Sequence, residues 1–170
     1  IDPNAFDPIT FTNQDNDSPA VIVKVMNDDY TTSEDLESVI IGFKLTSEPL
    51  SWVDIPLSIG SNTDEVDLDD NKVRIEKENW DDYTLNQITL TGIDDPIIDG
   101  NQTFEFITGD PTSLDLFYGS LNADDVADIK LINKDNDFPF LNITEPEILS
   151  EDKNSTNISI ALGNKPTGKA

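Results

Sequence analysis

Apolar and polar residues alternate along most of the chain. Val21, Val23 and Val25 begin the pattern, and two longer alternating runs span residues 39–45 and 53–59. Because successive side chains of a β-strand point to opposite faces, a period of two is typical of strands that bury one face. Four shorter sets complete the pattern: Val73 and Ile75, Ile88 and Leu90, Phe104 and Phe106, and Ile129 and Leu131.

Clusters of Gly, Pro, Asn and Asp separate these runs, so the pattern predicts seven short strands between residues 18 and 137. No helical period of comparable length is present. Seven strands with inside–outside alternation predict an all-β fold, a seven-stranded antiparallel Greek-key β-sandwich of immunoglobulin-like type. The residues expected to line its core are Val39, Ile41, Phe43, Val53, Ile55, Leu57, Ile75, Ile88, Leu90, Phe104, Phe106, Ile129 and Leu131.

Two residues place further conditions on this fold. Pro56 lies inside the third run and has no N–H to donate, so we expect its strand at the edge of a sheet. Trp80 lies in a turn-rich stretch between two strands, and we expect its ring to close one end of the sandwich rather than to stack on a ligand.

A short phrase occurs twice in the chain, at an offset of 120 residues. Residues 13–19 read Asn-Gln-Asp-Asn-Asp-Ser-Pro, and residues 133–139 read Asn-Lys-Asp-Asn-Asp-Phe-Pro. After a deletion of three residues the match continues at an offset of 117, where Ser-Glu-Asp at 33–35 corresponds to Ser-Glu-Asp at 150–152. A period near 120 residues is typical of an array of whole domains and is too long for a solenoid repeat.

The repeat divides the chain into three parts. Residues 1–17 are expected to be the C-terminal tail of a preceding repeat, 18–137 a complete repeat, and 138–170 the N-terminal part of the following repeat. The preceding part would supply a last strand and the following part a first hairpin. The neighbouring repeats of the same chain are therefore the first expected partners.

The charge balance excludes some partners. The chain has 35 Asp and Glu against 10 Lys and Arg, a net charge of −25. Nucleic-acid binding needs a basic surface, and an anionic membrane repels such a chain, so neither partner is expected. No apolar run is long enough to insert into a bilayer. A soluble acidic surface, as in a salt-adapted organism, explains part of this charge but not its clustering at expected turns.

Cysteine and histidine are both absent. The sequence therefore cannot build a disulfide, a zinc site, a thiol nucleophile or a histidine base. Because a secreted eukaryotic module is expected to contain disulfides, their absence favours a bacterial surface protein, extracellular or attached to the cell surface.

Acidic residues cluster where strands begin or end. Hard oxygen ligands that converge at one pole of a sandwich are what Ca²⁺ requires for its six to eight contacts, and Ca²⁺ is the expected cofactor. Magnesium is less expected, because it retains its water ligands. The alternative for each residue is that Asp and Asn are good turn formers. The candidate ligands in this pattern are Asp94, Asp95, Asp99, Asp135 and Asp137.

An EF-hand is excluded as the source of this pattern. The stretch Asp95-Pro96-Ile97-Ile98-Asp99-Gly100 resembles the first half of an EF-hand loop, but its third position is Ile97. The twelfth position is Phe106 where the loop requires glutamate.

The order and spacing of several motifs resemble the Calx-beta domain, a calcium-binding sandwich found in sodium–calcium exchangers, integrin β4 and large bacterial surface proteins. The bacterial tandem-repeat variant is the most similar. The motifs are the pair Ser33-Glu34, the stretch from Val73 to Trp80, the stretch from Gln87 to Asp95 with its Thr-Gly-x-Asp-Asp ending, the turn from Asp99 to Phe104, and the closing Asp135-Asn136-Asp137.

The resemblance implies a role for each candidate ligand. It implies side-chain ligands at Glu34, at the paired aspartates 94 and 95, at Asp99, and at Asp135 and Asp137, with a backbone carbonyl from Ile97. The ligand from the loop after the third strand stays open between Asp64 and Glu65. Asn136 stands where the exchanger domains have a third aspartate, which leaves the number of ions open.

The sequence favours two classes of function and disfavours a third. The first is a calcium-stabilised repeat module of a large extracellular surface protein that acts as a structural rod, filament or adhesin stalk, with identical chains as further partners and an unidentified surface ligand. The second is a calcium-sensing regulatory domain that changes conformation on ion binding, although no effector region is evident. An enzyme, such as a hydrolase with two carboxylates, is not expected, because the acids lie at strand ends and not in a cleft.

Overall fold

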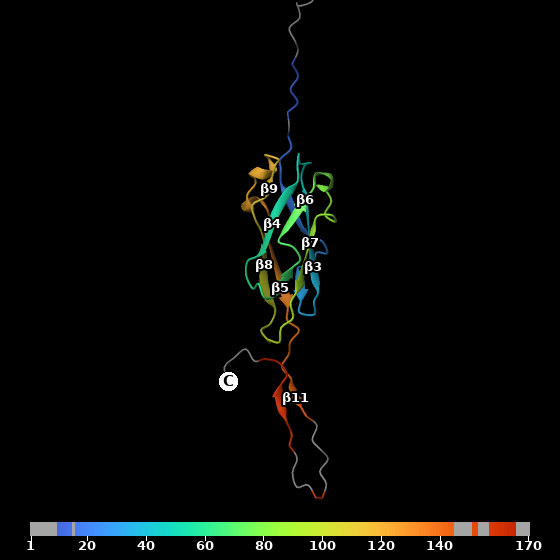
Figure 1. Cartoon of the computed structure of the whole chain (residues 1–170), viewed down its shortest axis with the longest axis vertical. Coiled ribbons are helices and arrows are strands. Elements are labelled where there is room, and N and C mark those ends of the chain that lie inside the picture. Colours follow the sequence, from blue (N-terminus) through green and yellow to red (C-terminus); the bar gives the residue numbers. More distant parts are fainter. Residues whose placement is uncertain (1–9, 15, 145–150, 153–156, 166–170) are drawn as a thin grey trace, which may run out of the picture.

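The computed structural model describes residues 10–14, 16–144, 151–152 and 157–165, and Figure 1 shows their arrangement. Two sheets make up the main body. The first has the order β1 (Val21–Val25), β3 (Ser38–Leu45), β7 (Gln87–Gly92) and β5 (Val66–Leu68). The second has the order β2 (Thr31–Ser33), β10 (Ile129–Lys134), β8 (Gln102–Thr108), β4 (Val53–Ile59) and β6 (Lys72–Ile75), and β9 (Thr112–Ser113) also pairs with β4. Three short 3₁₀ turns lie between strands: η1 (Lys77–Asn79), η2 (Tyr118–Ser120) and η3 (Ala123–Asp125).

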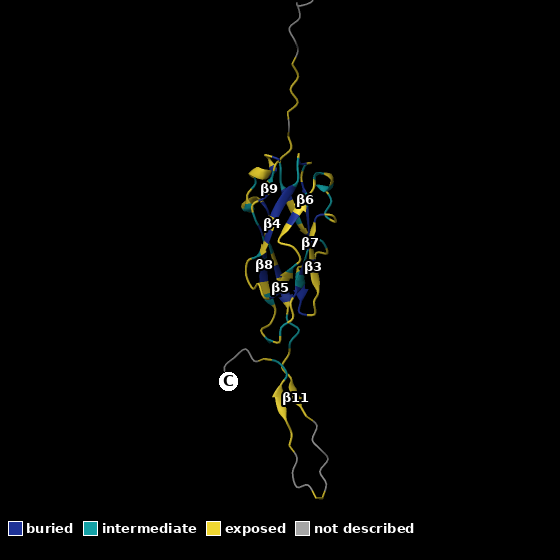
Figure 2. Ribbon diagram, viewed as in Figure 1, coloured by how far each residue is buried: buried dark blue, intermediate teal, exposed yellow. Residues whose placement is uncertain are grey.

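The two sheets face each other across one apolar core, which is dark blue in Figure 2. Phe43 of β3 and Phe106 of β8 meet there with ring centroids 6.3 Å apart. Of the predicted core residues, Ile129 is partly buried against the cluster and all the others are buried within it. The prediction of an all-β sandwich is therefore confirmed, and each alternating run forms one of its strands.

The strands that the alternation missed are short. β2, β5 and β9 have two or three residues each, which is too few to show a period of two. β2 also departs from the antiparallel prediction, because it runs parallel to β10, with Thr31 opposite Ile132. Its Thr32 and Ser33 are buried although they are polar.

The prediction that Pro56 lies in an edge strand is wrong. Its strand, β4, lies inside the sheet between β8 and β6. Along one side, β4 pairs with β9 through Val53 and Asp54 and with β8 from Leu57 onward. Pro56 faces the break between these two partners, and its carbonyl oxygen accepts a bond from Gly109 N–H at 2.8 Å. The missing proline N–H therefore falls where neither partner strand requires a ladder bond.

Trp80 packs against the core as a partly buried residue, as expected. Its carbonyl oxygen accepts a hydrogen bond from the N–H of Leu45 at 2.7 Å, which ties the turn after η1 to the end of β3.

A separate antiparallel hairpin, β11 (Leu141–Ile143) with β12 (Ile160–Leu162), follows the main body. Its six residues are exposed, and Figure 2 shows them in yellow. At the repeat offsets of 120 and 117, its register is the same as that of β1 with β3. The opposed pairs are Leu141–Leu162 and Ile143–Ile160 in the hairpin, and Val21–Leu45 and Val23–Phe43 in the main body.

The two ends of the sandwich have different neighbours. We call the end from which β10 continues into β11 the hairpin pole, and the end at which the N-terminal segment enters β1 the entry pole (Figure 1). In the N-terminal part, the described residues 10–14, 16 and 17 form no strand. The rest of the predicted last strand, residues 1–9 and 15, lies outside the described residues, as do 145–150, 153–156 and 166–170 of the predicted following repeat.

An ion-pair group joins β4 to β6. The carboxylate of Asp54 accepts bonds from Arg74 Nε at 2.6 Å, from Arg74 Nη2 at 2.7 Å and from Lys72 Nζ at 3.3 Å. The guanidinium of Arg74 also lies over the Trp52 ring, 4.4 Å from its centroid. The hydrogen bonds from Arg74 are the largest influence on the carboxyl group and lower the pKa of Asp54.

We predict that Asp54→Asn lowers the free energy of unfolding by about 1–3 kcal/mol at pH 7, because a charged hydrogen-bonded pair is lost. A folded-state pKa below the unfolded value gives stability that is present above the unfolded pKa and is lost as pH falls through the folded pKa. The difference in the free energy of unfolding between parent and variant, measured by urea unfolding, should therefore decrease as the pH is lowered from 5 to 2. Asp81→Asn, at an exposed position, is the matched control. A difference that persists unchanged at pH 2 contradicts the ion-pair explanation.

Candidate metal centre

Glu34 is held at the hairpin pole by the turn that follows β2. Its backbone N–H donates to the carbonyl of Lys134 at 3.0 Å, at the end of β10. Ser33 closes the turn, because its hydroxyl accepts from Asp35 N–H at 3.1 Å and its carbonyl from Leu36 N–H at 3.0 Å. Leu36 adopts a positive φ of 65° to complete the turn. The Glu34 side chain is thereby enclosed, and the residue is only 3% exposed.

The phrase that closes the repeat brings two more carboxylates to Glu34. Asn136 N–H donates to Glu34 Oε2 at 3.0 Å, and Asp137 N–H donates to Asp135 Oδ1 at 2.7 Å. Asp135 Oδ2 accepts from Gly100 N–H at 2.6 Å. One carboxylate oxygen from each of Glu34, Asp135 and Asp137 lies within 4.8 Å of the other two. We call these three residues the carboxylate cluster.

The loop between β7 and β8 lies beside the carboxylate cluster. Asn101 Oδ1 accepts from Asp135 N–H at 3.1 Å, next to the bond from Gly100. Gly100 has a φ of 76°, a conformation that side chains with a Cβ rarely adopt. Earlier in the loop, Asp95 Oδ1 accepts from Ile97 N–H at 2.6 Å. These bonds fix the loop that contains Asp94, Asp95 and Asp99 against the end of β10.

A buried polar bridge supports the cluster from inside. Asn133 of β10 is 1% exposed, and its amide donates to Glu65 Oε2 at 3.1 Å while its Oδ1 accepts from Thr32 Oγ1 at 2.9 Å. Gly92 of β7 leaves room for this bridge, since a Cβ there would lie 2.5 Å from Asn133 Oδ1 and still closer to the carbonyl oxygen of Ser33. The glycine of the Thr-Gly-x-Asp-Asp motif therefore permits three strands to approach one another.

Burial and like charges act together on the cluster. Burial raises the pKa of Glu34, and the charges of Asp135, Asp95 and Asp137 raise it further, against the hydrogen bond from Asn136. Burial also raises the pKa of Asp137, with contributions from Asp135, Asp94 and Asp95. Both shifts mean that negative charge at this pole is unfavourable unless a proton or cation is present.

Glu65, on the loop before β5, is likewise a buried carboxylate with other negative charges around it. It is 9% exposed, and burial raises its pKa, with smaller contributions from the charges of Asp99, Asp64 and Asp95. Among the described residues, the ion pairs join Lys72 and Arg74 to Asp54 and Lys77 to Glu48, so no lysine or arginine neutralises the carboxylate cluster.

The predicted ligands therefore fall into two groups. Glu34, Asp135 and Asp137 come together in the carboxylate cluster, and Asn136 binds Glu34 through its backbone N–H and Asp35 through its amide. The remaining candidates lie in the surrounding loops at the same pole, and their oxygens are not part of the 4.8 Å cluster. These are Asp64, Glu65, Asp94, Asp95, Ile97 and Asp99.

Three contributing residues were missed by the sequence analysis: Asp35, Asn133 and Asn164. Asn133 carried a usable signal, because it opens the phrase that occurs again at Asn13. Asn164 carried none, because its contact with the Asp137 carboxylate crosses from the hairpin to the main body. Only the tertiary structure reveals that contact.

The donor set fits a hard divalent cation. The cluster offers only oxygen atoms, and one of them, Asp137 Oδ2, is buried without a hydrogen-bond partner. An unpaired buried carboxylate oxygen is costly, and a cation removes that cost. These three carboxylates could therefore hold a metal ion that prefers oxygen ligands.

Other acidic groups of the chain have structural partners. Asp125 and Asn122 form a capping box at η3, and Asp128 Oδ1 accepts from Thr108 N–H at 2.8 Å. These residues behave as turn and cap formers.

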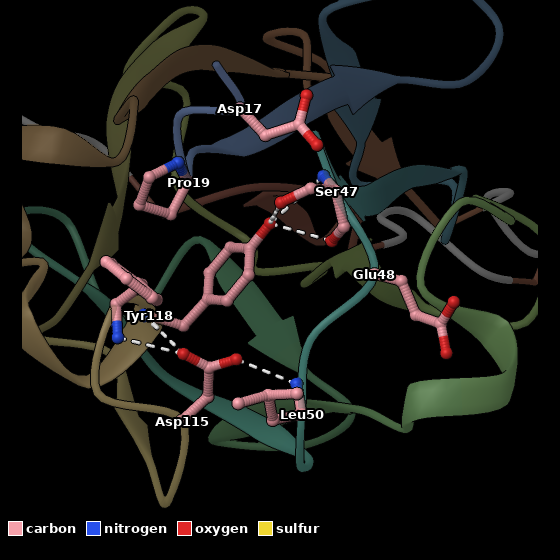
Figure 3. A pocket seen from close by; sticks show the side chains of 8 residues that line it. Asp17, Pro19, Ser47, Glu48, Leu50, Asp115 and Tyr118 are labelled. Carbon is pink, nitrogen blue, oxygen red and sulfur yellow. Dashed lines mark hydrogen bonds between the residues drawn. The ribbon is translucent and has the colours of Figure 1, made fainter. Parts of the chain in front are cut away.

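A cavity of about 370 Å³ lies at the entry pole, and Figure 3 shows its lining. Tyr118 OH donates to the carbonyl of Ser47 at 2.8 Å, and Asp115 Oδ2 accepts from Leu50 N–H at 2.7 Å. Burial acts to raise the pKa of Asp115, but backbone N–H groups of Leu50, Phe117 and Tyr118 outweigh it, so the pKa is lowered. This cavity therefore contains a carboxylate that is already satisfied by the protein, unlike those of the hairpin pole.

We predict that Gly92→Ala destabilises the domain by about 1–3 kcal/mol, the usual cost of overpacking, because its Cβ collides with backbone and with a buried amide. Urea unfolding measures the effect. In Gly60→Ala the new Cβ meets the end of the Ile107 side chain, which can rotate away, so this control should cost clearly less. Equal losses in both variants would show that the bridge at Asn133 is not tightly packed.

A scan against models of protein families and a search of curated proteins each found no match to this chain. In the part of the chain that the structure describes, no helix has the length and apolar character needed to cross a membrane.

Proposed function

We propose that the chain is a calcium-stabilised repeat module of a large extracellular surface protein, which acts as a structural rod, filament or adhesin stalk. The observation that carries the proposal is the carboxylate cluster at the hairpin pole, where Glu34, Asp135 and Asp137 converge without a neutralising lysine or arginine among the described residues. A cation at this point sits at the junction with the next part of the chain.

Calcium would be held by the carboxylates of Glu34, Asp135 and Asp137. The charges of Asp94 and Asp95 raise the pKa of Asp137 and add to the attraction of the carboxylate cluster for a cation. When bound, the ion would neutralise like charges and join β2, β10 and the adjoining turns. The residues themselves orient the site: Asn136 N–H holds Glu34, and Gly100 N–H holds Asp135.

The sandwich in this proposal is of the seven-stranded Greek-key, immunoglobulin-like type. The order β1-β3-β7-β5 opposite β10-β8-β4 supports it, because it matches the four-strand and three-strand sheets of a constant-type immunoglobulin domain. β2 and β6 extend the two edges of the second sheet, and β9 also pairs with β4. The arrangement is also the one that the resemblance to Calx-beta domains implies.

The tandem organisation is supported by the two hairpins. β11 with β12 repeats the register of β1 with β3, at the offsets by which the sequence phrases repeat. The N-terminal segment and the hairpin leave the sandwich at opposite poles, which favours modules joined end to end (Figure 1). On this proposal, residues 18–137 are one module between parts of two others, in a bacterial protein at or outside the cell surface.

Calcium addition tests the function. At a free ion concentration near one hundred times the dissociation constant, calcium that binds only the folded state should add about 2.7 kcal/mol to the free energy of unfolding. For a domain of this size that corresponds to a rise of roughly 5–10 °C in the melting temperature. Calorimetry with chelator and with calcium measures the shift, and sodium chloride at matched ionic strength should not reproduce it.

Asp135→Asn should abolish most of the calcium shift, because it removes one charge of the carboxylate cluster. In chelator, its melting temperature should equal or exceed that of the parent, since a repulsive charge has gone. Asp81→Asn, at an exposed position, removes the same charge and should retain the full shift. If the parent melts at one temperature with and without calcium, the proposed function is wrong and these aspartates serve as turn residues.

A further inference from the structure

The segment after β12 returns to the hairpin pole. Lys165 N–H donates to the carbonyl of Pro96 at 2.9 Å, and Lys165 forms a parallel bridge with Ile97. The residue before it, Asn164, donates from its side-chain amide to Asp137 Oδ1. Two points of contact therefore connect this segment to the main body: the loop that follows β7, and the carboxylate cluster.

An apolar seam holds the same segment in place. Ile98 of the loop lines a small cavity together with Pro139 and Phe140, which precede β11, and with Leu141 and Leu162 of the hairpin. Gly163 lies so close to the Phe140 ring that a Cβ at this position would overlap it. Asn164 follows directly, so its side chain is positioned by packing on one side and by Asp137 on the other.

Two oxygen atoms at this contact lack a partner. Among the described residues, Asp137 Oδ2 and Asn164 Oδ1 are the buried side-chain atoms that form no hydrogen bond. Both atoms are acceptors, and the two side chains to which they belong are joined by the hydrogen bond from Asn164 to Asp137. A pair of buried acceptors requires a donor or a cation between or beside them. Asn164 lies outside the carboxylate cluster, so its unpaired oxygen is an observation separate from the clustering of the three carboxylates.

We propose that Asn164 supplies its side-chain oxygen as a ligand to the divalent cation bound by Glu34, Asp135 and Asp137. The inference rests on the proposed function and names a partner for that site: the segment after the first hairpin of the following repeat. The cation site is then completed across the joint between two modules. An amide oxygen is a common calcium ligand, so the chemistry of the set stays all-oxygen.

The corresponding positions meet at the entry pole as well. At the repeat offsets, Asp17 corresponds to Asp137 and Ser47 to Asn164. Asp17 and Ser47 line the same cavity, and Figure 3 shows both side chains on one side of Tyr118. At each pole, the last aspartate of the repeated phrase therefore lies beside an oxygen-bearing side chain of the residue two places after the second hairpin strand. The Ser47 hydroxyl is hydrogen-bonded to Tyr118 OH at 3.0 Å, whereas Asn164 Oδ1 has no partner. The oxygen of Asn164 is therefore the more available ligand atom of the two.

A ligand from across the joint couples ion binding to the position of the hairpin. An ion that binds more tightly when the segment is docked must, by thermodynamic linkage, make the docked position more favourable by the same factor. The joint would be stiff when calcium is bound and more variable when it is removed.

Two substitutions at Asn164 test the ligand in the full chain. Asn164→Ala removes both oxygen and amide, and should weaken calcium binding about tenfold or more by isothermal titration. Asn164→Asp keeps oxygen atoms but loses the donor to Asp137, so a ligand role leaves the affinity equal to or tighter than that of the parent. Asn142→Ala, an exposed asparagine of β11, is the matched control and should bind as the parent does.

A distance measurement tests the coupling. The chain has no cysteine, so Lys130→Cys on β10 and Ala161→Cys on β12 give two exposed attachment sites for spin labels. In the labelled parent and in Asn164→Asp, calcium should narrow the distribution of distances between the labels. In labelled Asn164→Ala, the distribution should stay broad at the calcium concentration that narrows the parent.

The outcomes separate the two proposals. If Asn164→Ala binds calcium as the parent does, Asn164 is not a ligand, while the proposed function stands. A water molecule is then the partner of the two oxygens. If Asn164→Asp is as weak as Asn164→Ala, Asn164 acts as a hydrogen-bond donor and the ligand proposal is overturned. If the parent binds no calcium, both proposals fail.

Discussion

Buried negative charge at one pole is the constraint on which the rest of this structure depends. Glu34 is 3% exposed and Glu65 is 9% exposed, and burial raises the pKa of each. The protein partly offsets this cost with hydrogen bonds from the backbone of Asn136 and the amide of Asn133. These neutral donors orient the carboxylates but leave their charge in place. Negative charge therefore stays uncompensated where the turn after β2, the polar bridge and the end of β10 meet. A bound cation can neutralise it.

The core was predictable from the sequence because it depends on a local pattern. A run such as residues 39–45 shows several alternations, and burial of one face follows from the pleat. β2 was not predictable, because its Thr32 and Ser33 are polar and are buried by their bonds and neighbours. The position of Pro56 depended on which strands lie beside β4, and no local pattern contains that information.

The residues of the candidate site also differ in whether the sequence could predict them. Asp135 and Asp137 are close in sequence and follow a strong strand, so their convergence could be anticipated, and Glu34 was found through a motif resemblance. Asn133 and Asn164 contribute through contacts that join distant segments. Asparagine is common in turns of this chain, so its presence alone does not distinguish a structural amide from a ligand. Their roles emerge only from burial and from the oxygens left without partners.

If the modules are joined in tandem as proposed, the shared register of the two hairpins has a consequence for how they fold. Neighbouring modules with the same strand pairing risk exchanging hairpins, a known failure of tandem domains. Gly42 of β3 opposes that exchange, because a Cβ there would lie 3.0 Å from Tyr83 Cβ, and Tyr83 lies outside the hairpin and stays in place when the hairpin is exchanged. The corresponding residue before β12 is Ser159. A neighbour's hairpin would bring the side chain of that serine against Tyr83, so the difference between glycine and serine at this single position favours pairing of each module with its own strands during folding.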